Sequence, residues 1–186
     1  MVTAPETATL EAMTREAATP ATIVVAAWRV AETVVDPELP MLTLADLGVL
    51  REITLEDQRI VVSLTPTYSG CPAMHEMRRD VHERLSAAGL GPVEVRTVLS
   101  PAWSTDWITP EGRRKLAAAG IAPPQAAPAR SAGPIPLTLS PAPPAVSCPA
   151  CGSGNTHRTA AFSGTACKDL FRCGDCAEPF EHIKEI

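Results

Sequence analysis

A formal charge of −5 over 186 residues and a pI near 5.4 argue against the clustered basic surface on which nucleic-acid binding depends. Residues 1–20 contain three glutamates and lack a basic start, so they do not resemble a secretory signal. No run of about 18 apolar residues follows. We therefore expect a cytoplasmic protein with neither a nucleic acid nor a membrane as its partner.

The first half of the chain predicts a helix followed by a hairpin. Residues 1–19 lack apolar residues at a fixed period, and we expect them to be disordered. From Thr22 apolar residues recur at helical spacing until Asp36-Pro37, where proline stops the helix. Two strand-like segments, 49–55 and 59–64, flank a short polar turn and predict a β-hairpin.

A second helix, a third strand and a short third helix follow. The second helix is predicted to begin at Cys71-Pro72, because proline fits the first helical position, and to end near Gly89. Residues 93–98 predict a strand, and Thr109 is expected to cap a helix that runs to about Ala119. Trp103 and Trp107 precede it and either anchor a partner or close the core. Residues 20–121 thus predict an α+β domain of order αββαβ.

A proline-rich segment separates this domain from a small C-terminal module. Eight of the 26 residues in 122–147 are proline, which favours an extended linker that would reach about 80 Å if fully stretched. Residues 148–186 are too few to bury an adequate apolar core without a metal or disulfides.

Four cysteines in the C-terminal module form two C-x-x-C pairs separated by 21 residues, the spacing of a zinc ribbon. Tetrahedral Zn²⁺ takes four thiolates and leaves no open position, so we expect a structural site. An iron site with the same ligands is the alternative. The expected ligands are Cys148, Cys151, Cys173 and Cys176.

Cys167 is surplus to a four-ligand site. It is a small buried hydrophobe, a reactive thiol beside Lys168, or a ligand elsewhere, and the first reading is favoured. For His157 and His182 a surface role is favoured over metal ligation.

A second group of chemically useful residues lies in the N-terminal domain. Cys71 is expected at a helix N-terminus, where backbone N–H groups favour a thiolate. Asp36 and Glu38 form an acidic turn after the first helix, and Thr67 precedes Cys71 by four residues. Thiolate, carboxylate and hydroxyl together bind a metal or a cluster transiently, although Asp36 can also serve as a cap and Cys71 as a packing residue.

These residues resemble a known family. Over residues 20–120 the chain is similar to the metal–sulfur cluster assembly domain of SufT-type proteins, and the resemblance implies that Cys71, Asp36, Glu38 and Thr67 line one metal- or cluster-handling site. Tyr68 stands where many members have a second threonine. The motifs that carry the resemblance are Asp36-Pro37-Glu38-Leu39, Asp46-Leu47-Gly48, Thr67 and Gly70-Cys71-Pro72.

A narrower resemblance covers both domains. The segments 65–72, 104–108 and 166–180 are similar to the PaaD (PaaJ) family, whose members are subunits associated with the bacterial phenylacetyl-CoA ring epoxidase. This implies a non-catalytic accessory protein of aerobic phenylacetate degradation that matures an iron or iron–sulfur centre and has oxygenase or reductase subunits as partners. The alternative is a structural or regulatory subunit of the oxygenase complex.

Overall fold

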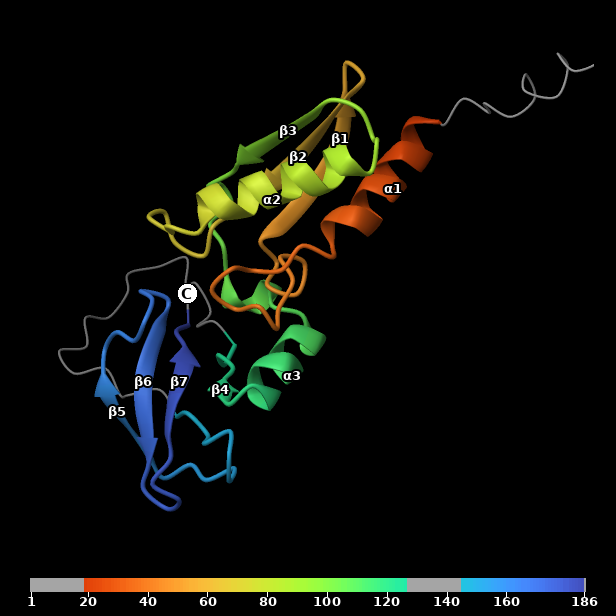
Figure 1. Cartoon of the computed structure of the whole chain (residues 1–186). Coiled ribbons are helices and arrows are strands. Elements are labelled where there is room, and N and C mark those ends of the chain that lie inside the picture. Colours follow the sequence, from red (N-terminus) through yellow and green to blue (C-terminus); the bar gives the residue numbers. More distant parts are fainter. Residues whose placement is uncertain (1–18, 127–144, 186) are drawn as a thin grey trace, which may run out of the picture.

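The computed structural model describes residues 19–126 and 145–185 (Figure 1). Helix α1 spans Pro20–Ala31, with Thr19 as its cap: the Thr22 N–H donates to Thr19 Oγ1 at 3.3 Å. Helix α1 therefore starts at Pro20, two residues before the predicted Thr22. Proline suits the first position of a helix, because the N–H that it lacks would have no helical partner there. Of residues 1–19, which were expected to be disordered, Thr19 instead caps α1, and residues 1–18 lie outside the described part of the chain.

The predicted hairpin is confirmed. Strand β1 (Leu50–Glu56) pairs antiparallel with β2 (Arg59–Leu64), and the turn places Asp57 and Gln58 at φ 46° and 62°. Strand β3 (Val93–Thr97) then pairs with β2 in parallel, which requires the crossover that helix α2 (Met74–Ala87) provides. The sheet order is β1-β2-β3.

Helices α1 and α2 pack against each other and against this sheet (Figure 1). Ile60, Val62 and Leu64 of the central strand are fully buried, and they meet Val81 and Leu85 of α2 in one core. Arg59 and Ser63 lie on the other face with the buried Val61 between them, and ion pairs there join Arg59 to Glu94 and Arg96 to Glu56. This alternation gives a two-layer α+β domain, as predicted.

The start of α2 differs from the prediction. Cys71 and Pro72 lie in a turn before the helix, and the Cys71 N–H donates to the Tyr68 carbonyl at 3.1 Å. The first helical i→i−4 bond runs from Met77 to Ala73 at 2.9 Å. Two i→i−3 bonds, from Cys71 to Tyr68 and from Met74 to Cys71, close turns over this segment, and the helix begins only at Met74.

Both tryptophans close the end of the core. Trp103 is 3% exposed and its Nε1 donates to the Leu47 carbonyl at 2.9 Å. Trp107, in the 3₁₀ turn η1 (Thr105–Trp107), stacks under the Arg51 guanidinium at 3.5 Å. Gly48 has φ 68°, and a Cβ on it would lie 2.6 Å from Trp107 Cβ, so only glycine fits.

Helix α3 (Pro110–Ala118) follows the tryptophans, with Thr109 as its N-cap as predicted.

A second sheet joins the two halves of the chain. It has the order β4-β7-β6-β5, with β4 at Ile121–Ala122, β5 at Thr156–Ala160, β6 at Lys168–Cys173 and β7 at Pro179–Ile183. Strand β4 directly follows α3 and pairs in parallel with β7 of the C-terminal ribbon, by which we mean residues 145–185. Ile183, at the end of β7, is buried in the core of the N-terminal domain. The ribbon is thus docked on that domain.

The two ends of the expected linker meet on the ribbon. Ala122 and Val146 are buried in one cluster with Phe171 and Phe180, and Gln125 Nε2 donates to the Ala145 carbonyl at 2.5 Å. Residues 127–144 lie outside the described part of the chain. Among the described residues no helix is both long and apolar enough to cross a bilayer.

Candidate metal-handling sites

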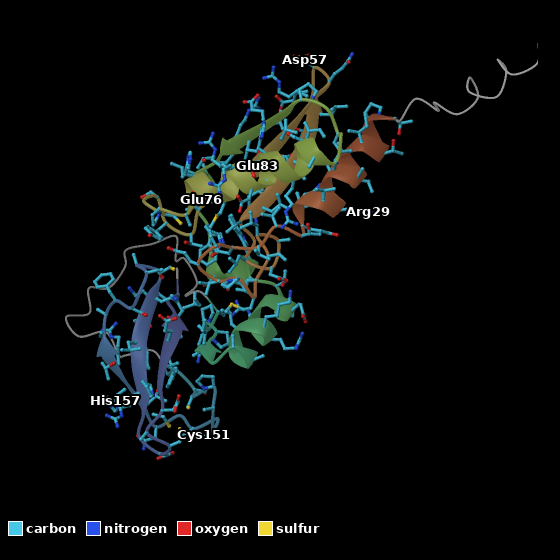
Figure 2. The ribbon with its side chains drawn as sticks, in the orientation of Figure 1. Arg29, Asp57, Glu76, Glu83, Cys151 and His157 are labelled. Carbon is cyan, nitrogen blue, oxygen red and sulfur yellow. The ribbon has the colours of Figure 1, made fainter. Side chains whose placement is uncertain are left out.

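The four expected ligands converge at the end of the ribbon far from the N-terminal domain, where Figure 2 labels Cys151. Their four sulfur atoms lie within 4.8 Å of one another, with Cys148–Cys176 at 3.7 Å and Cys151–Cys173 at 3.6 Å. A tetrahedral ion with metal–sulfur bonds of about 2.3 Å requires sulfur separations of about 3.8 Å. The cysteines therefore fit one tetrahedral, thiophilic ion.

Local contacts hold the two C-x-x-C turns together. The Gly174 N–H donates to the Asn155 carbonyl at 2.7 Å, and Asn155 Nδ2 donates to the Asp175 carboxylate at 2.7 Å. Hydrogen bonds from the Cys176 and Asp175 backbone N–H groups lower the pKa of the Cys173 thiol to about 7. Such donors stabilise thiolate charge, which a closed four-sulfur site needs.

The second group of residues surrounds the loop between β2 and α2. Cys71 is half-buried there, with Thr67 and Tyr68 half-buried in the same loop. Burial raises the pKa of the Cys71 thiol; the Ala73 N–H opposes this, and Glu38 and Asp36 add to it. Burial, the largest cause, therefore opposes the expected thiolate, and the charges of Glu38 and Asp36 act in the same direction.

In the acidic turn after α1, Asp36 is more deeply buried than Glu38. Asp36 is 4% exposed, and its Oδ1 accepts the N–H groups of Glu38 and Leu39 at 2.8 Å each. Asp36 therefore caps the turn, one of its two expected roles, through Oδ1. Glu38 is half-buried, and burial together with the Asp36 charge raises its pKa. The pKa of Asp36 is also raised by burial, despite those two N–H groups.

Asp46, from the same family motif, has a structural role instead. Its Oδ2 accepts the Lys115 ammonium at 2.7 Å and the Thr43 N–H at 3.0 Å. Burial would raise its pKa, but these hydrogen bonds outweigh burial and lower it. Asp46 therefore ties α3 to the loop before β1.

Cys167 belongs to neither of the predicted ligand sets, yet it approaches the Cys71 group. Its thiol is half-buried, 3.1 Å from Thr165 Oγ1, and it interacts electrostatically with both Cys71 and Glu38. Burial raises its pKa, and Lys168 opposes the shift without reversing it. A thiol activated by Lys168 is therefore not what the structure shows. That Cys167 faces the N-terminal domain was missed, because only the docking of the ribbon reveals it.

His182 is buried, contrary to the surface role favoured for it. It is 1% exposed, and its Nδ1 lies 2.9 Å from Asp169 Oδ1 on the neighbouring strand. Its Nε2 lies 3.3 Å from Glu185 Oε1, but in a geometry that makes no hydrogen bond. Docking β7 between β4 and β6 covers this imidazole. His157 is exposed, as expected, and so are His75 and His82 on α2.

Family models match both halves of the chain. An iron–sulfur cluster assembly protein family matches residues 25–99, and the PaaD zinc β-ribbon domain matches residues 133–184. A crystal structure of a domain of unknown function, DUF59, from Bacillus anthracis is 26% identical, with a TM-score of 0.49 over 52% of this chain and 93% of that one.

Two relatives carry functional descriptions. An Fe–S protein maturation auxiliary factor of Porphyromonas gingivalis (strain W83) is 30% identical over 47% of this chain and 85% of its own length. A protein of Escherichia coli K12, assigned as one of the subunits of a 1,2-phenylacetyl-CoA epoxidase, is 40% identical over 86% of this chain and 91% of its own. The chain therefore belongs to the PaaD family, in which an iron–sulfur assembly domain is followed by a zinc β-ribbon.

Proposed function

We propose that this chain is a non-catalytic, cytoplasmic accessory protein of a phenylacetyl-CoA ring epoxidase system, and that it helps to mature an iron or iron–sulfur centre of the oxygenase. Its similarity to the E. coli epoxidase protein supports the pathway, and its similarity to the P. gingivalis maturation factor supports the activity. The partners in this proposal are the oxygenase or reductase subunits.

The observation that supports the proposal is that the Glu38 and Asp36 carboxylates act electrostatically on the half-buried Cys71 thiol. Burial penalises the ionised forms of Asp36, Glu38 and Cys71 and raises their pKa values; the Asp36 charge adds to the shift of Glu38, and both carboxylates add to that of Cys71. A divalent iron ion or a cationic cluster would offset that penalty, and carboxylate with thiolate is a donor set that iron accepts. Thr67, in the same loop, completes the proposed set.

The raised thiol pKa also favours a carrier over an enzyme. A catalytic cysteine needs a lowered pKa or an adjacent base, whereas the charges facing Cys71 act in the opposite direction. We therefore assign no catalytic residue.

The ribbon metal in this proposal is zinc, held by Cys148, Cys151, Cys173 and Cys176. With all four positions taken by sulfur, the ion supplies folding free energy and no reaction chemistry. The ribbon's own buried cluster is small, which is why a structural metal is needed.

The decisive experiment examines the oxygenase made in cells that lack this protein. A maturation factor acts before turnover, so the oxygenase components should assemble but contain too little iron or cluster, and purified holo-oxygenase should work without it. A structural or regulatory subunit would instead leave the metal content normal, with activity restored by simply adding the purified protein. Normal iron with activity rescued by addition would overturn the proposal in favour of that alternative.

A further inference from the structure

Cys167 and the four-cysteine cluster lie at opposite ends of strand β6. Cys167 immediately precedes the strand and Cys173 ends it. Six residues of extended chain span about 20 Å, so the two cysteines cannot share an ion. The four sulfurs already complete a tetrahedral shell, which leaves Cys167 available for other chemistry.

The loop that carries Cys167 is tied to the end of β7, where the ribbon enters the N-terminal domain. The Lys184 N–H donates to the Cys167 carbonyl at 3.0 Å, and Lys184 Nζ donates to the Ala166 carbonyl at 2.8 Å. Next to Lys184, Ile183 is buried in the core of the N-terminal domain. Cys167 is therefore held beside the strand end that is buried in the N-terminal domain.

This contact brings Cys167 to the proposed cargo site. In Figure 1 the loop before α2 extends toward the end of the ribbon where β6 begins. Cys167 interacts electrostatically with Cys71 and Glu38, and its neighbour Lys168 interacts with Asp36 and Glu38. Lys168 is itself held by Glu181 at 2.7 Å. Thiols from both domains therefore lie within electrostatic range of one acidic turn.

We propose that Cys167 is the second thiol ligand of this site, so that the two domains bind iron or a small iron–sulfur cluster jointly. The N-terminal domain contributes Cys71 and Glu38, and the ribbon contributes Cys167. This inference rests on the proposed function and names ligands for its cargo. Each thiol that binds gives its proton to solvent, so binding one divalent ion releases two protons and changes no oxidation state.

The site is open in the described structure. Among residues 19–126 and 145–185, the four ribbon cysteines alone bring three or more such ligand atoms close enough for one ion. A change of rotamer moves a cysteine sulfur by about 3 Å, so half-buried Cys71 and Cys167 can close on a cargo by rotating about single bonds. Ligands that must move to close suit a protein that has to release what it binds.

The test uses the full-length, zinc-loaded protein without oxygen, with Co²⁺ as a spectroscopic probe in place of Fe²⁺. Zinc resists displacement by cobalt at thiolate sites, and zinc analysis after the titration verifies this. The wild-type protein should bind one Co²⁺ beyond its zinc, with thiolate-to-cobalt charge-transfer absorption. Cys167→Ser and Cys71→Ser should each lose about half of that absorption and bind Co²⁺ at least about tenfold more weakly, at unchanged zinc content.

The outcomes separate this inference from the proposed function. If Cys167→Ser binds Co²⁺ like the wild type while Cys71→Ser does not, the second ligand is overturned and the Cys71 site stands. If the wild type binds no Co²⁺ beyond its zinc, both are overturned.

The carboxylate ligand is tested by Glu38→Gln, which should bind Co²⁺ more weakly than the wild type. Glu178→Gln, at an exposed carboxylate near the four-cysteine end, is the matched control and should bind Co²⁺ like the wild type.

A second measurement needs no variant and so does not depend on how a substituted chain folds. A short bifunctional thiol reagent applied to the zinc-loaded wild type should join Cys71 to Cys167, as mapped by peptide mass, and Co²⁺ should suppress the product. Single adducts without a cross-link, or Co²⁺ that protects Cys71 but not Cys167, would overturn the inference.

Discussion

The two ends of strand β6 carry cysteines in opposite circumstances. At one end four sulfurs within 4.8 Å form a closed cluster in which backbone N–H donors favour the Cys173 thiolate; the Ser153 N–H does the same for Cys151, but the neighbouring sulfurs outweigh it and raise that pKa to about 12. At the other, burial raises the pKa values of the Cys167 and Cys71 thiols, and the Glu38 charge adds to both shifts, so thiolates are disfavoured. The first arrangement suits permanent binding and the second suits exchange, so ligand geometry and local charge, rather than the cysteines themselves, decide what each site does.

Removing one ligand of the four-cysteine cluster should have the largest effect on stability. Structural zinc binds cysteine-rich peptides with an apparent free energy of about 10–16 kcal/mol, far more than the ribbon's small buried cluster can replace. Cys148→Ser should therefore lose zinc and unfold the ribbon, as measured by elemental analysis and by the amide spectrum of residues 145–185. Cys167→Ser is the control and should keep its zinc. Zinc retained in full by Cys148→Ser would contradict the assignment.

Weakening the contact between the ribbon and the N-terminal domain should lower the stability less and leave the zinc in place. Ile183 is 4% exposed within the N-terminal core, and truncating a buried isoleucine to alanine costs about 3 kcal/mol. Ile183→Ala should lower the free energy of unfolding by that amount in denaturant titrations, with normal zinc content. Val25→Ala, at a side chain that is 51% exposed, is the matched control. A loss of zinc from Ile183→Ala would show that the two ends are not independent.

The sequence predicts most of what depends on local pattern. The β1–β2 hairpin, the αββαβ order and the Thr109 cap all follow from residue type and period, and the structure contains them. The two C-x-x-C pairs likewise fall together because each turn is a local feature. Spacing along the chain is enough for such elements.

What the sequence does not predict is the docking of one domain on the other. Strand β4 has two residues, too few for a period, and it pairs with a strand some 60 positions later. The burial of His182 and the approach of Cys167 to Cys71 both follow from that pairing. Cys167 was visible as surplus to the four-ligand site, but no local rule says which surface it meets.

Removing the Cys71 thiol should change the function of the protein much more than its stability. Cys71 is half-buried, and Cys71→Ala deletes one sulfur atom, so the free energy of unfolding should change by about 1 kcal/mol or less. The oxygenase matured by this variant should nevertheless be as poor in iron as that from cells without the protein. A drop in stability of several kcal/mol would instead identify Cys71 as a packing residue.

The smallest effect tests the charges around that thiol. Burial is the main cause of the raised pKa of Cys71, the Ala73 N–H opposes it, and the Glu38 carboxylate raises it further. Since only the thiolate is alkylated, Glu38→Gln should lower that pKa, and Cys71 in the zinc-loaded protein should react faster with iodoacetamide at neutral pH. The difference should shrink as the pH rises past both pKa values, because the thiol is then ionised in either protein. Glu178→Gln should not change the rate, and a slower reaction in Glu38→Gln would mean that Glu38 does not face Cys71.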